Sequence, residues 1–408
     1  MQNRWCRPIS AMAMLRPAFP SAVFGAVALL ASIGAAPAAA LLPIDRGALQ
    51  STLDGLAREM MVPGAAVLLR TPEGEFVAIY GQRGLDDPTP VTIKDHVRIG
   101  SNTKTWTGTV ILQLVEEGKI GLRDPVSKFR SDVPNGDNIT IEQLLNMRSG
   151  LFNYSTTFAL NDALDKTPQR AWQPEELLAM AYPIPPYFKP GEGYHYSNTN
   201  TVLLGLIAEK IDGKPLEKIF QDRIFGPLGL KDTLLPAKTS NSIPNPHPRG
   251  YMYTDNVMTL ATNAIPADLQ VAARKGSLKP NDQTDANPSW GWSAGAGIST
   301  AGDLATYVEA LTTGKLLKPE MQAVRMQSPR PQSADNPAGA LYGLAIAQFG
   351  PLFGHTGELP GFNTFMGSDP VNKVTLIVWT NLAPAADGRD PATTIARALL
   401  AQVYVSLK

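Results

Sequence analysis

The sequence is poor in cysteine and histidine, with one Cys and four His among 408 residues. A single thiol excludes a disulfide framework and a cysteine-based zinc site. The histidines show no i,i+4 pair and no HExxH motif, and the chain has no glycine-rich phosphate loop of Walker or Rossmann spacing. They lie far apart, at His96, His195, His247 and His355. We therefore expect no metal ion, no nucleotide and no other cofactor.

An excess of charge of either sign is also missing. The chain carries 36 basic and 36 acidic residues, which excludes broad electrostatic capture of nucleic acid. Hydrophobic residues make up 44% of the chain, which is ample for a large core. Proline and glycine, at 35 each without a period, indicate long ordered loops rather than collagen or a linker.

Residues 1–40 have the pattern of a secretory signal. Three arginines form a basic head, an apolar run follows over 22–36, and the small residues of 37–40 suit a signal peptidase. The apolar run is too short to span a membrane, although an N-terminal membrane anchor is the alternative interpretation. The only cysteine, Cys6, lies in the basic head. We expect an exported protein, periplasmic or secreted, whose mature chain has no membrane span.

Apolar periodicity along the rest of the chain predicts strands toward both ends and helices between them. The predicted helices cover 46–60, 101–118, 202–211, 300–311 and 391–404, and the predicted strands cover 65–69, 75–80, 341–349, 362–368 and 374–380. A capping box, Thr140 with Gln143, starts a further helix in the middle of the chain. Strand pairs joined by short turns, with helices at both chain ends, indicate a mixed α/β (α+β) fold. We expect an antiparallel sheet flanked by helices, with a helical region inserted in its middle.

One serine motif, Gly291–Gly295, fits the G-x-S-x-G nucleophile elbow around Ser293. That elbow needs a buried apolar strand before the serine, whereas 281–290 is polar and contains proline. We interpret this stretch as a glycine-rich turn that leads into a helix. Ser293 is therefore rejected as a nucleophile.

A second serine motif, Ser101-x-x-Lys104, lies at the start of a predicted helix. Residues i and i+3 share a helix face, so the Lys104 amine can approach the Ser101 hydroxyl. Burial and the positive potential of the helix N-terminus both lower the pKa of such a lysine, which favours removal of the serine proton. The alternative is an exposed helical lysine near a capping serine.

Two further motifs carry polar groups suited to acyl transfer. Tyr196-x-Asn198 follows the proline-rich loop 183–193; a tyrosine can pass a proton, and an asparagine can hold a lysine or bind a substrate amide. The stretch 355–357, His-Thr-Gly, lies in a predicted strand, where glycine lets a substrate backbone pair with the strand edge. The alternatives are an ordinary N-cap with a core tyrosine, and a strand-end histidine with satisfied hydrogen bonds.

These three motifs, in this order and spacing, resemble those of the penicillin-recognising serine hydrolases. The Tyr-Ser-Asn and His-Thr-Gly variants are similar to the class C β-lactamase and D-alanyl-D-alanine carboxypeptidase branch, which also contains esterases and D-aminopeptidases. Residues 99–101, 144–151 and 293–304 also resemble that branch, so the similarity covers about 45 to 385. The resemblance implies an α/β sheet domain of 41–118 and 291–408 around an all-α domain of 119–290, with a cleft between them.

The resemblance also implies roles for single residues. Ser101 would be the nucleophile of an acyl-enzyme, Lys104 and Tyr196 would share the general-base and general-acid work, and neither is favoured over the other as the base. Asn198 would bind both the acyl amide and Lys104. The substrate-binding strand would supply His355 in place of the more usual lysine, the Thr356 hydroxyl, Gly357, and the N–H of Glu358, which would form the oxyanion hole with the N–H of Ser101.

Three functions compete on this scaffold. The first is an exported serine hydrolase of D-alanyl peptides or β-lactams, and the second is a carboxylesterase or a D-amino-acid amidase or aminopeptidase. The third is a non-catalytic module that binds peptidoglycan; retention of all three motifs argues against it. The expected partner is a small-molecule or peptide acyl substrate, with peptidoglycan as a further candidate.

The charge near the third motif bears on the substrate. No Lys or Arg occurs from Pro331 to Asn372, and Glu358 follows the motif directly. A substrate carboxylate would meet a like charge there unless Arg148 or Arg249 folds in. We therefore expect neutral esters or amides to be better substrates than free acids, unless Glu358 points to solvent and contributes only its N–H.

Overall fold

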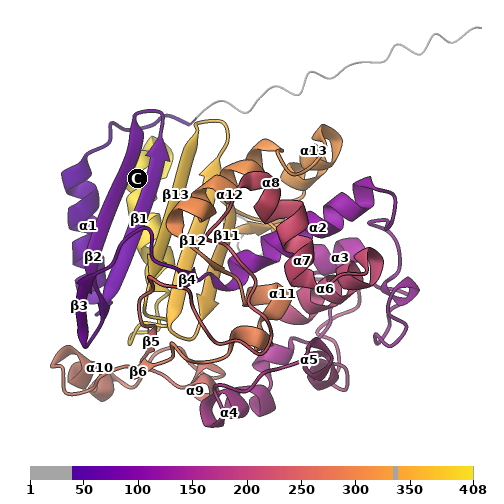
Figure 1. Cartoon of the computed structure of the whole chain (residues 1–408), viewed down its shortest axis with the longest axis horizontal. Helices are drawn as coiled ribbons and strands as arrows, with labels where there is room; N and C mark the ends of the chain where they lie inside the picture. The colour runs from indigo at the N-terminus through magenta and orange to yellow at the C-terminus, as the bar shows by residue number, and fades with distance from the viewer. Residues whose placement is uncertain (1–38, 334–338, 408) are drawn as a thin grey trace, which may run out of the picture. The chain divides into compact units, whose positions relative to one another are not determined.

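The computed structural model describes residues 39–333 and 339–407, and its central feature is a nine-stranded antiparallel sheet. The strand order is β3-β2-β1-β13-β12-β11-β10-β9-β8, of which Figure 1 labels the part from β3 to β11. The strands are β1 Gly64–Thr71, β2 Gly74–Gly84, β3 Asp87–Pro90, β8 Arg330–Pro331, β9 Leu341–Tyr342, β10 Ala347–Phe349, β11 Leu352–Leu359, β12 Phe362–Asp369 and β13 Val374–Thr380. The first and last thirds of the chain thus meet where β1 pairs with β13. The predicted signal at 1–40 lies almost wholly outside the described residues.

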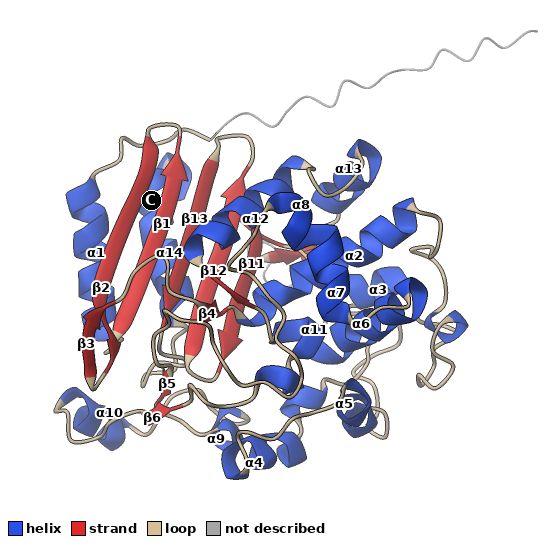
Figure 2. Ribbon diagram, viewed as in Figure 1, coloured by secondary structure: helices blue, strands red, loops and turns tan. Residues whose placement is uncertain are grey.

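Helices cover both faces of the sheet, and β13 shows why. Its side chains alternate between the faces: Leu376 and Val378 pack with α1 (Arg46–Glu59) and α14 (Pro391–Val403), whereas Trp379 packs on the opposite side. Figure 2 shows α14 behind the sheet and α12, Ala301–Thr313, in front of it. Because both faces are covered, β13 is a continuous apolar run rather than an alternating one.

Between α2 and α11 the regular secondary structure is mainly helical, joined by long loops. Besides α1, α12 and α14, the helices are α2 Thr103–Glu116, α3 Ile141–Leu145, α4 Phe158–Lys166, α5 Pro174–Ala181, α6 Asn198–Asp212, α7 Leu216–Phe220, α8 Gly226–Leu228, α9 Asn256–Thr259, α10 Ala267–Arg274, α11 Trp292–Gly295 and α13 Pro319–Gln327. A two-residue strand pair, β5 (Tyr251–Met252) with β6 (Asn281–Asp282), interrupts them, so the segment 119–290 is not wholly helical. The described residues belong to one compact unit. The division into two domains stays a prediction.

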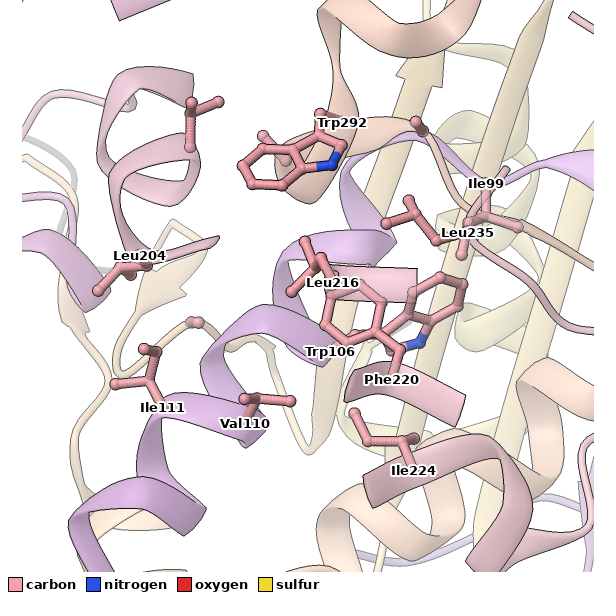
Figure 3. Close-up of a cluster of buried hydrophobic side chains, with 14 of the residues drawn as sticks. Ile99, Trp106, Val110, Ile111, Leu204, Leu216, Phe220, Ile224, Leu235 and Trp292 are labelled. Carbon is pink, nitrogen blue, oxygen red and sulfur yellow. The ribbon is translucent and has the colours of Figure 1, made fainter. Parts of the chain in front are cut away.

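An apolar cluster supports the start of α2, where the second serine motif lies. Trp106 is fully buried and packs edge-on against Phe220, which Figure 3 shows beside it, and against Phe225, with ring centroids 5.7 and 4.8 Å apart. Burying an aromatic side chain of this size contributes about 2–3 kcal/mol. The first turns of α2 are therefore held rigidly against α7.

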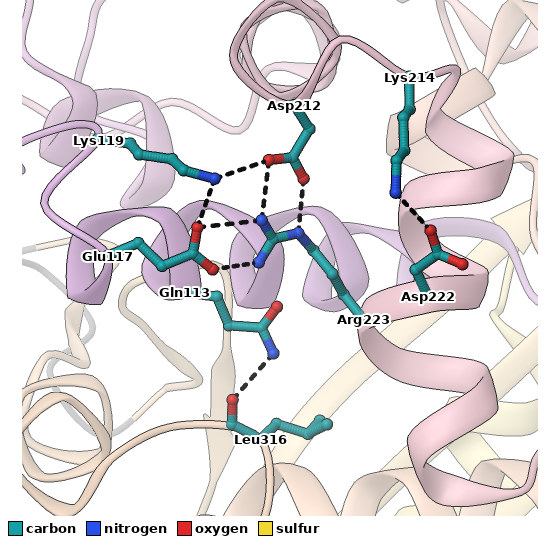
Figure 4. A network of polar contacts seen from close by, with 8 residues as sticks. All are labelled: Gln113, Glu117, Lys119, Asp212, Lys214, Asp222, Arg223 and Leu316. Carbon is teal, nitrogen blue, oxygen red and sulfur yellow. Dashed lines mark hydrogen bonds and ion pairs between the residues drawn. The ribbon is translucent and has the colours of Figure 1, made fainter.

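The far end of α2 is fixed by charge. Arg223 pairs with Glu117 just after α2 and with Asp212 at the end of α6, both at 2.6 Å, and Lys119 joins both carboxylates (Figure 4). The Arg223 hydrogen bond lowers the pKa of Glu117 to about 2. A network of this kind holds the two helices in one alignment more firmly than an isolated surface pair does.

Several sequence predictions are confirmed in detail. The first helix and the last strand lie within one residue of their predicted bounds, and the capping box of Thr140 and Gln143 forms. The predicted strand 341–349 is wrong as a single element. It splits into β9 and β10 because Ala345 adopts a φ of +50° and donates its N–H to the Leu145 carbonyl at 2.9 Å. Among the described residues no helix is both long and apolar enough to cross a membrane.

Candidate active site

Ser101 and Lys104 face each other at the start of α2. Ser101 lies in the one-turn 3₁₀ helix Gly100–Asn102, and Lys104 follows in the first turn of α2. Lys104 Nζ donates to Ser101 Oγ at 2.9 Å and to the Ala294 carbonyl at 2.7 Å. The lysine is fully buried, and burial lowers its pKa well below the usual value. The amine is therefore suited to accept the Ser101 proton, and the alternative of an exposed lysine is wrong.

Two glycines bring the nucleophile against the strand of the third motif. Gly100 has a φ of +52°, and a Cβ there would lie 2.4 Å from the Glu358 backbone nitrogen. A Cβ on Gly357 would lie 1.9 Å from the Ile99 carbonyl oxygen. Neither position tolerates a side chain, so the backbones before Ser101 and around Glu358 touch directly.

The open edge of β11 lies at this contact. Leu359 and Phe362 are the last pair before the two-residue turn to β12 and form a hydrogen-bonded pair. Hydrogen-bonded and non-hydrogen-bonded pairs alternate along an antiparallel ladder, so the N–H groups of Thr356 and Glu358 point away from β12. In the described residues, β10 pairs with β11 only as far as Gly354. The N–H of Glu358 is thus directed toward Ser101, where an oxyanion would form.

Tyr196 covers the lysine. Its ring centroid is 4.7 Å from Lys104 Nζ, a cation–π distance. The Tyr196 hydroxyl is shielded from solvent and has no hydrogen-bond partner within the described part of the chain. Burial raises the pKa of Tyr196, and the nearby Ser101 hydroxyl offsets only part of the rise. The hydroxyl is therefore protonated and free to donate.

Asn198 lines the larger cavity together with Tyr196, but its hydrogen bonds differ from the expected ones. Its side-chain amide donates to Ser155 Oγ at 2.9 Å, and its backbone N–H donates to Asn153 Oδ1 at 3.0 Å. No hydrogen bond joins it to Lys104 among the described residues; the Ala294 carbonyl occupies that position on the amine. The expected contact between Asn198 and Lys104 is thus replaced by a backbone acceptor.

Ser293, next to Ala294, has a structural role. Its side chain is fully buried, and its hydroxyl donates to the Thr201 carbonyl at 3.0 Å. The turn that it occupies, α11, presses against α2 and α6, so its neighbour reaches Lys104. The glycine-rich stretch therefore contributes a carbonyl to the site rather than a nucleophile.

His355 is held inside the sheet wall. Its Nε2 lies 3.2 Å from the Tyr342 hydroxyl, and its Nδ1 lies 2.5 Å from the Thr356 carbonyl. Burial lowers the pKa of His355 to about 3, and the Lys104 amine, when it is protonated, adds to the shift. The ring is therefore neutral, and both nitrogens have partners, as in the alternative interpretation of this motif. Tyr342 was missed at the sequence level, since nothing in the predicted strand around it marked that hydroxyl.

Two cavities meet at these residues. One, of about 590 Å³, is lined by residues that include Ser155, Asn161, Asn198, Asn256 and Trp290. The other, of about 310 Å³, is lined by Ser101, Tyr194, Gln332, Tyr342, Ala347, Phe349, His355 and Thr356. Tyr196 and Glu358 line both. The reacting carbonyl of a substrate would lie at this junction, with one half of the molecule in each cavity.

Glu358 is the acidic residue among the described residues that line these two cavities. The exposed part of the Glu358 side chain faces the two cavities. Burial among the cavity walls raises the pKa of Glu358, and the adjoining Asp390 carboxyl raises it further. None of the described residues that line either cavity is Lys or Arg. Arg148 donates to the Pro331 carbonyl at 3.0 Å, and Arg249 pairs with Asp282, so neither arginine enters the cleft. Asp390, which contacts Glu358, was also missed, because it lies at the N-terminus of α14, far from the three motifs in the sequence.

Comparison with known proteins places these motifs in context. The family model described as "Beta-lactamase" matches residues 50–400. "Protein flp" of Staphylococcus aureus (strain MW2) is 35% identical over 184 residues, which cover 42% of this chain and 34% of that protein. "Protein Rv1367c" of Mycobacterium tuberculosis (strain H37Rv) is 28% identical over 250 residues, or 57% of each chain. The chain thus spans a third to just over half of these relatives.

Solved structures match more completely. A D-stereospecific amidohydrolase from Streptomyces sp. superimposes with a TM-score of 0.73 at 30% identity, over 87% of this chain and 98% of that one. A D-amino acid amidase from Ochrobactrum anthropi SV3, complexed with L-phenylalanine, gives 0.73 at 25% identity over 87% and 97%. A penicillin binding protein from Bacillus halodurans shares the fold, with 0.68 at 22% identity over 86% and 98%. The predicted fold class is confirmed.

Proposed function

Because this chain belongs to the beta-lactamase family, we propose that it is a serine hydrolase that works through an acyl-enzyme on Ser101. The observation that carries this proposal is the contact of 2.9 Å between the buried Lys104 amine and the Ser101 hydroxyl. A lysine buried without a carboxylate partner costs stability, and a module that only binds has no use for it. The non-catalytic alternative is therefore disfavoured.

The geometry supports a division of labour in which Lys104 is the base and Tyr196 the acid. Neutral Lys104 takes the Ser101 proton as Oγ bonds to the substrate carbonyl carbon, and the N–H groups of Ser101 and Glu358 stabilise the oxyanion. Protonated Tyr196 gives its proton to the leaving nitrogen or oxygen as that bond breaks, and regains one from Lys104. Water then releases the acid by the same proton transfers in reverse.

For the substrate we favour amides or esters of amino acids with a neutral leaving group. The cleft offers the Glu358 carboxyl, which adjoins Asp390, and no lining cation among the described residues, so a substrate carboxylate finds no partner there and is repelled where Glu358 is ionised. The amidohydrolase at 30% identity and the D-amino acid amidase at 25% identity are named for the hydrolysis of D-configured substrates or amides. Their names support a D-amino-acid amidase activity here.

Export is a second proposal, supported by the sequence alone. The basic head and apolar run of residues 1–40 are typical of a signal peptide that is removed on secretion. Expression of the full chain, followed by mass spectrometry of the mature N-terminus, should show cleavage near residue 40. An intact N-terminus in the cell pellet would contradict export.

The activity is tested with a substrate panel. We expect turnover of D-phenylalanine amide and of a short-chain p-nitrophenyl ester, weaker turnover of L-phenylalanine amide, and least of nitrocefin and a D-Ala-D-Ala peptide. Ser101→Ala should abolish all of these activities, whereas Ser293→Ala should retain them. Wild-type rates in Ser101→Ala would contradict the assignment of Ser101 as the nucleophile. A preference for the D-Ala-D-Ala peptide would contradict the proposed substrate class.

A further inference from the structure

A third cavity, of about 380 Å³, continues the cleft away from the nucleophile. We name it the acidic cavity; it is lined by Leu164, Asp165, Pro168, Gln169, Thr254, Asp255, Asn281, Asp282, Gln283, Asp285 and Ala286. Leu164 also lines the 590 Å³ cavity beside Asn198. Leu164, Asn256 and Trp290 also border, together with the buried Arg98, a void of about 10 Å³, which is too small to hold a ligand group. Because Leu164 borders both larger cavities, a chain molecule bound at Ser101 that runs along the surface beside Leu164 would reach the acidic cavity.

Three of the four carboxylates there have a structural duty. Asp165 accepts the backbone N–H groups of Asn256 and Val257 at 2.8 and 2.9 Å, which ties α4 to the start of α9. Asp255 caps α9 through the Met258 N–H. These contacts explain why acidic residues gather here.

Asp282 also has a structural role, because it pairs with Arg249.

Two other features of the acidic cavity are not explained by a structural contact. The Asp285 side chain is exposed and forms no ion pair of its own in the described residues, although its charge acts on buried Arg98. Thr254 is 1% exposed, and its hydroxyl has no hydrogen-bond partner within the described residues. A buried hydroxyl without a partner costs about 1–3 kcal/mol, so this one is expected to serve a ligand.

The charges of the acidic cavity do not balance. Four carboxylates line it, and the guanidinium groups of Arg98 and Arg249 lie behind two of them, so two negative charges remain uncompensated. No Lys or Arg lines the cavity among the described residues. An ammonium or guanidinium group fits this chemistry, since it donates only, and carboxylates and a hydroxyl accept.

We propose that the acidic cavity is a subsite for a cationic group on the acyl portion of the substrate that Ser101 attacks. The cation would be a lysine-like ammonium or an arginine-like guanidinium, placed beyond the residue that forms the acyl-enzyme. The proposal rests on the hydrolase function proposed above and adds a preference for basic peptides to it.

Matched substrates test the preference. Amides of D-lysine and D-norleucine are compared first, and then Lys-D-Ala amide with norleucyl-D-Ala amide, and each with one glycine inserted. Norleucine keeps the length and apolar stem of lysine without the charge. We expect kcat/KM to favour lysine at least tenfold at one of these lengths, and the ratio to shrink as salt rises.

Two variants locate the effect. Asp255→Asn keeps an N-cap for α9 but removes one uncompensated charge. Thr254→Val removes the unpartnered hydroxyl; the loss of a structural hydrogen bond would lower folding stability, whereas the proposal predicts unchanged or higher stability together with a lower lysine-to-norleucine ratio. We expect each variant to lower the ratio at least threefold. Asp137→Asn, an exposed acid outside the cleft, is the matched control and should keep it.

Binding separates this proposal from the catalytic one. The same peptides are titrated onto Ser101→Ala, which keeps the acidic cavity whether or not Ser101 is the nucleophile. Tighter binding of the lysine peptides, lost in Thr254→Val, supports the subsite even where no amide is turned over. Equal binding and equal kcat/KM of lysine and norleucine peptides at every length would overturn the subsite while leaving the hydrolase function in place.

Discussion

The two walls of the cleft use different parts of the chain. The helical wall presents side chains from the starts of α2 and α6, namely Ser101, Lys104 and Asn198. The strand wall, β11, presents backbone: the N–H of Glu358 at an open edge, while its histidine is turned inward to Tyr342. Proton transfer is therefore expected to depend on the helical wall, and oxyanion stabilisation on the main chain of the strand wall.

This contrast makes substitutions unequal. A side chain on the helical wall is a reactant, so its removal lowers the rate directly. The strand wall supplies its chemistry through N–H groups that every residue has, so a substitution there acts on stability or on substrate choice. The predictions below test this difference, from the largest expected effect to the smallest.

Lys104→Met should lower kcat/KM for an amino acid amide by about 10³–10⁴-fold, because it removes the general base while filling the same volume. Stability should be unchanged or higher, since the variant buries no amine. Steady-state kinetics and thermal unfolding check both parts. Lys94→Met, an exposed lysine, is the control, and activity within tenfold of wild type in Lys104→Met would remove the lysine from its role.

Tyr196→Phe should lower amide hydrolysis by about 100-fold, because the leaving amine then lacks a proton donor. A p-nitrophenyl ester, whose leaving group departs as a stable anion, should lose much less. The two substrates are compared on one enzyme preparation, with Tyr80→Phe as the control. Equal losses on both would mean that Tyr196 acts as the base in the attack by Ser101 instead.

His355 should make the protein less stable in acid without being a catalyst. Its pKa of about 3 lies below the usual 6.5. Between pH 6.5 and pH 3 the unfolded chain therefore binds a proton at this histidine that the native state does not bind. Stability is therefore lost as pH falls through this window. Urea unfolding at pH 7 and pH 4 should show a smaller difference in His355→Gln than in wild type. An equal difference in both would assign the acid sensitivity to other groups.

The same contrast explains how much could be predicted from the sequence. Ser101 and Lys104 are three residues apart on one helix, so local geometry alone predicts their meeting. The Ala294 carbonyl comes from 190 positions farther along the chain and, being backbone, leaves no mark in the residue types. β13 was predicted to the residue because an apolar run covered on both faces has one interpretation, whereas the bend at Ala345 depends on a contact with Leu145.

Glu358→Gln should have the smallest effect and change substrate choice rather than rate. Where Glu358 is ionised, its carboxylate repels the carboxylate of a free-acid substrate by about 1 kcal/mol in a solvent-filled cleft, or about fivefold in kcat/KM. The glutamine variant keeps the backbone N–H and should therefore hydrolyse an amide as before, while the ratio of D-Ala-D-Ala peptide to its C-terminal amide rises.

The raised pKa of Glu358 gives this prediction a pH signature. A carboxyl with a raised pKa gains its charge at a higher pH, so discrimination against the free acid should grow in wild type as pH rises, and should grow less in Glu358→Gln. The ratio of kcat/KM for the free acid and the amide, measured from pH 6 to pH 9, checks this, with Glu320→Gln as the control on the protein surface. A ratio that does not depend on pH in wild type would show that the Glu358 side chain takes no part in selection, and that the strand wall acts through its backbone alone.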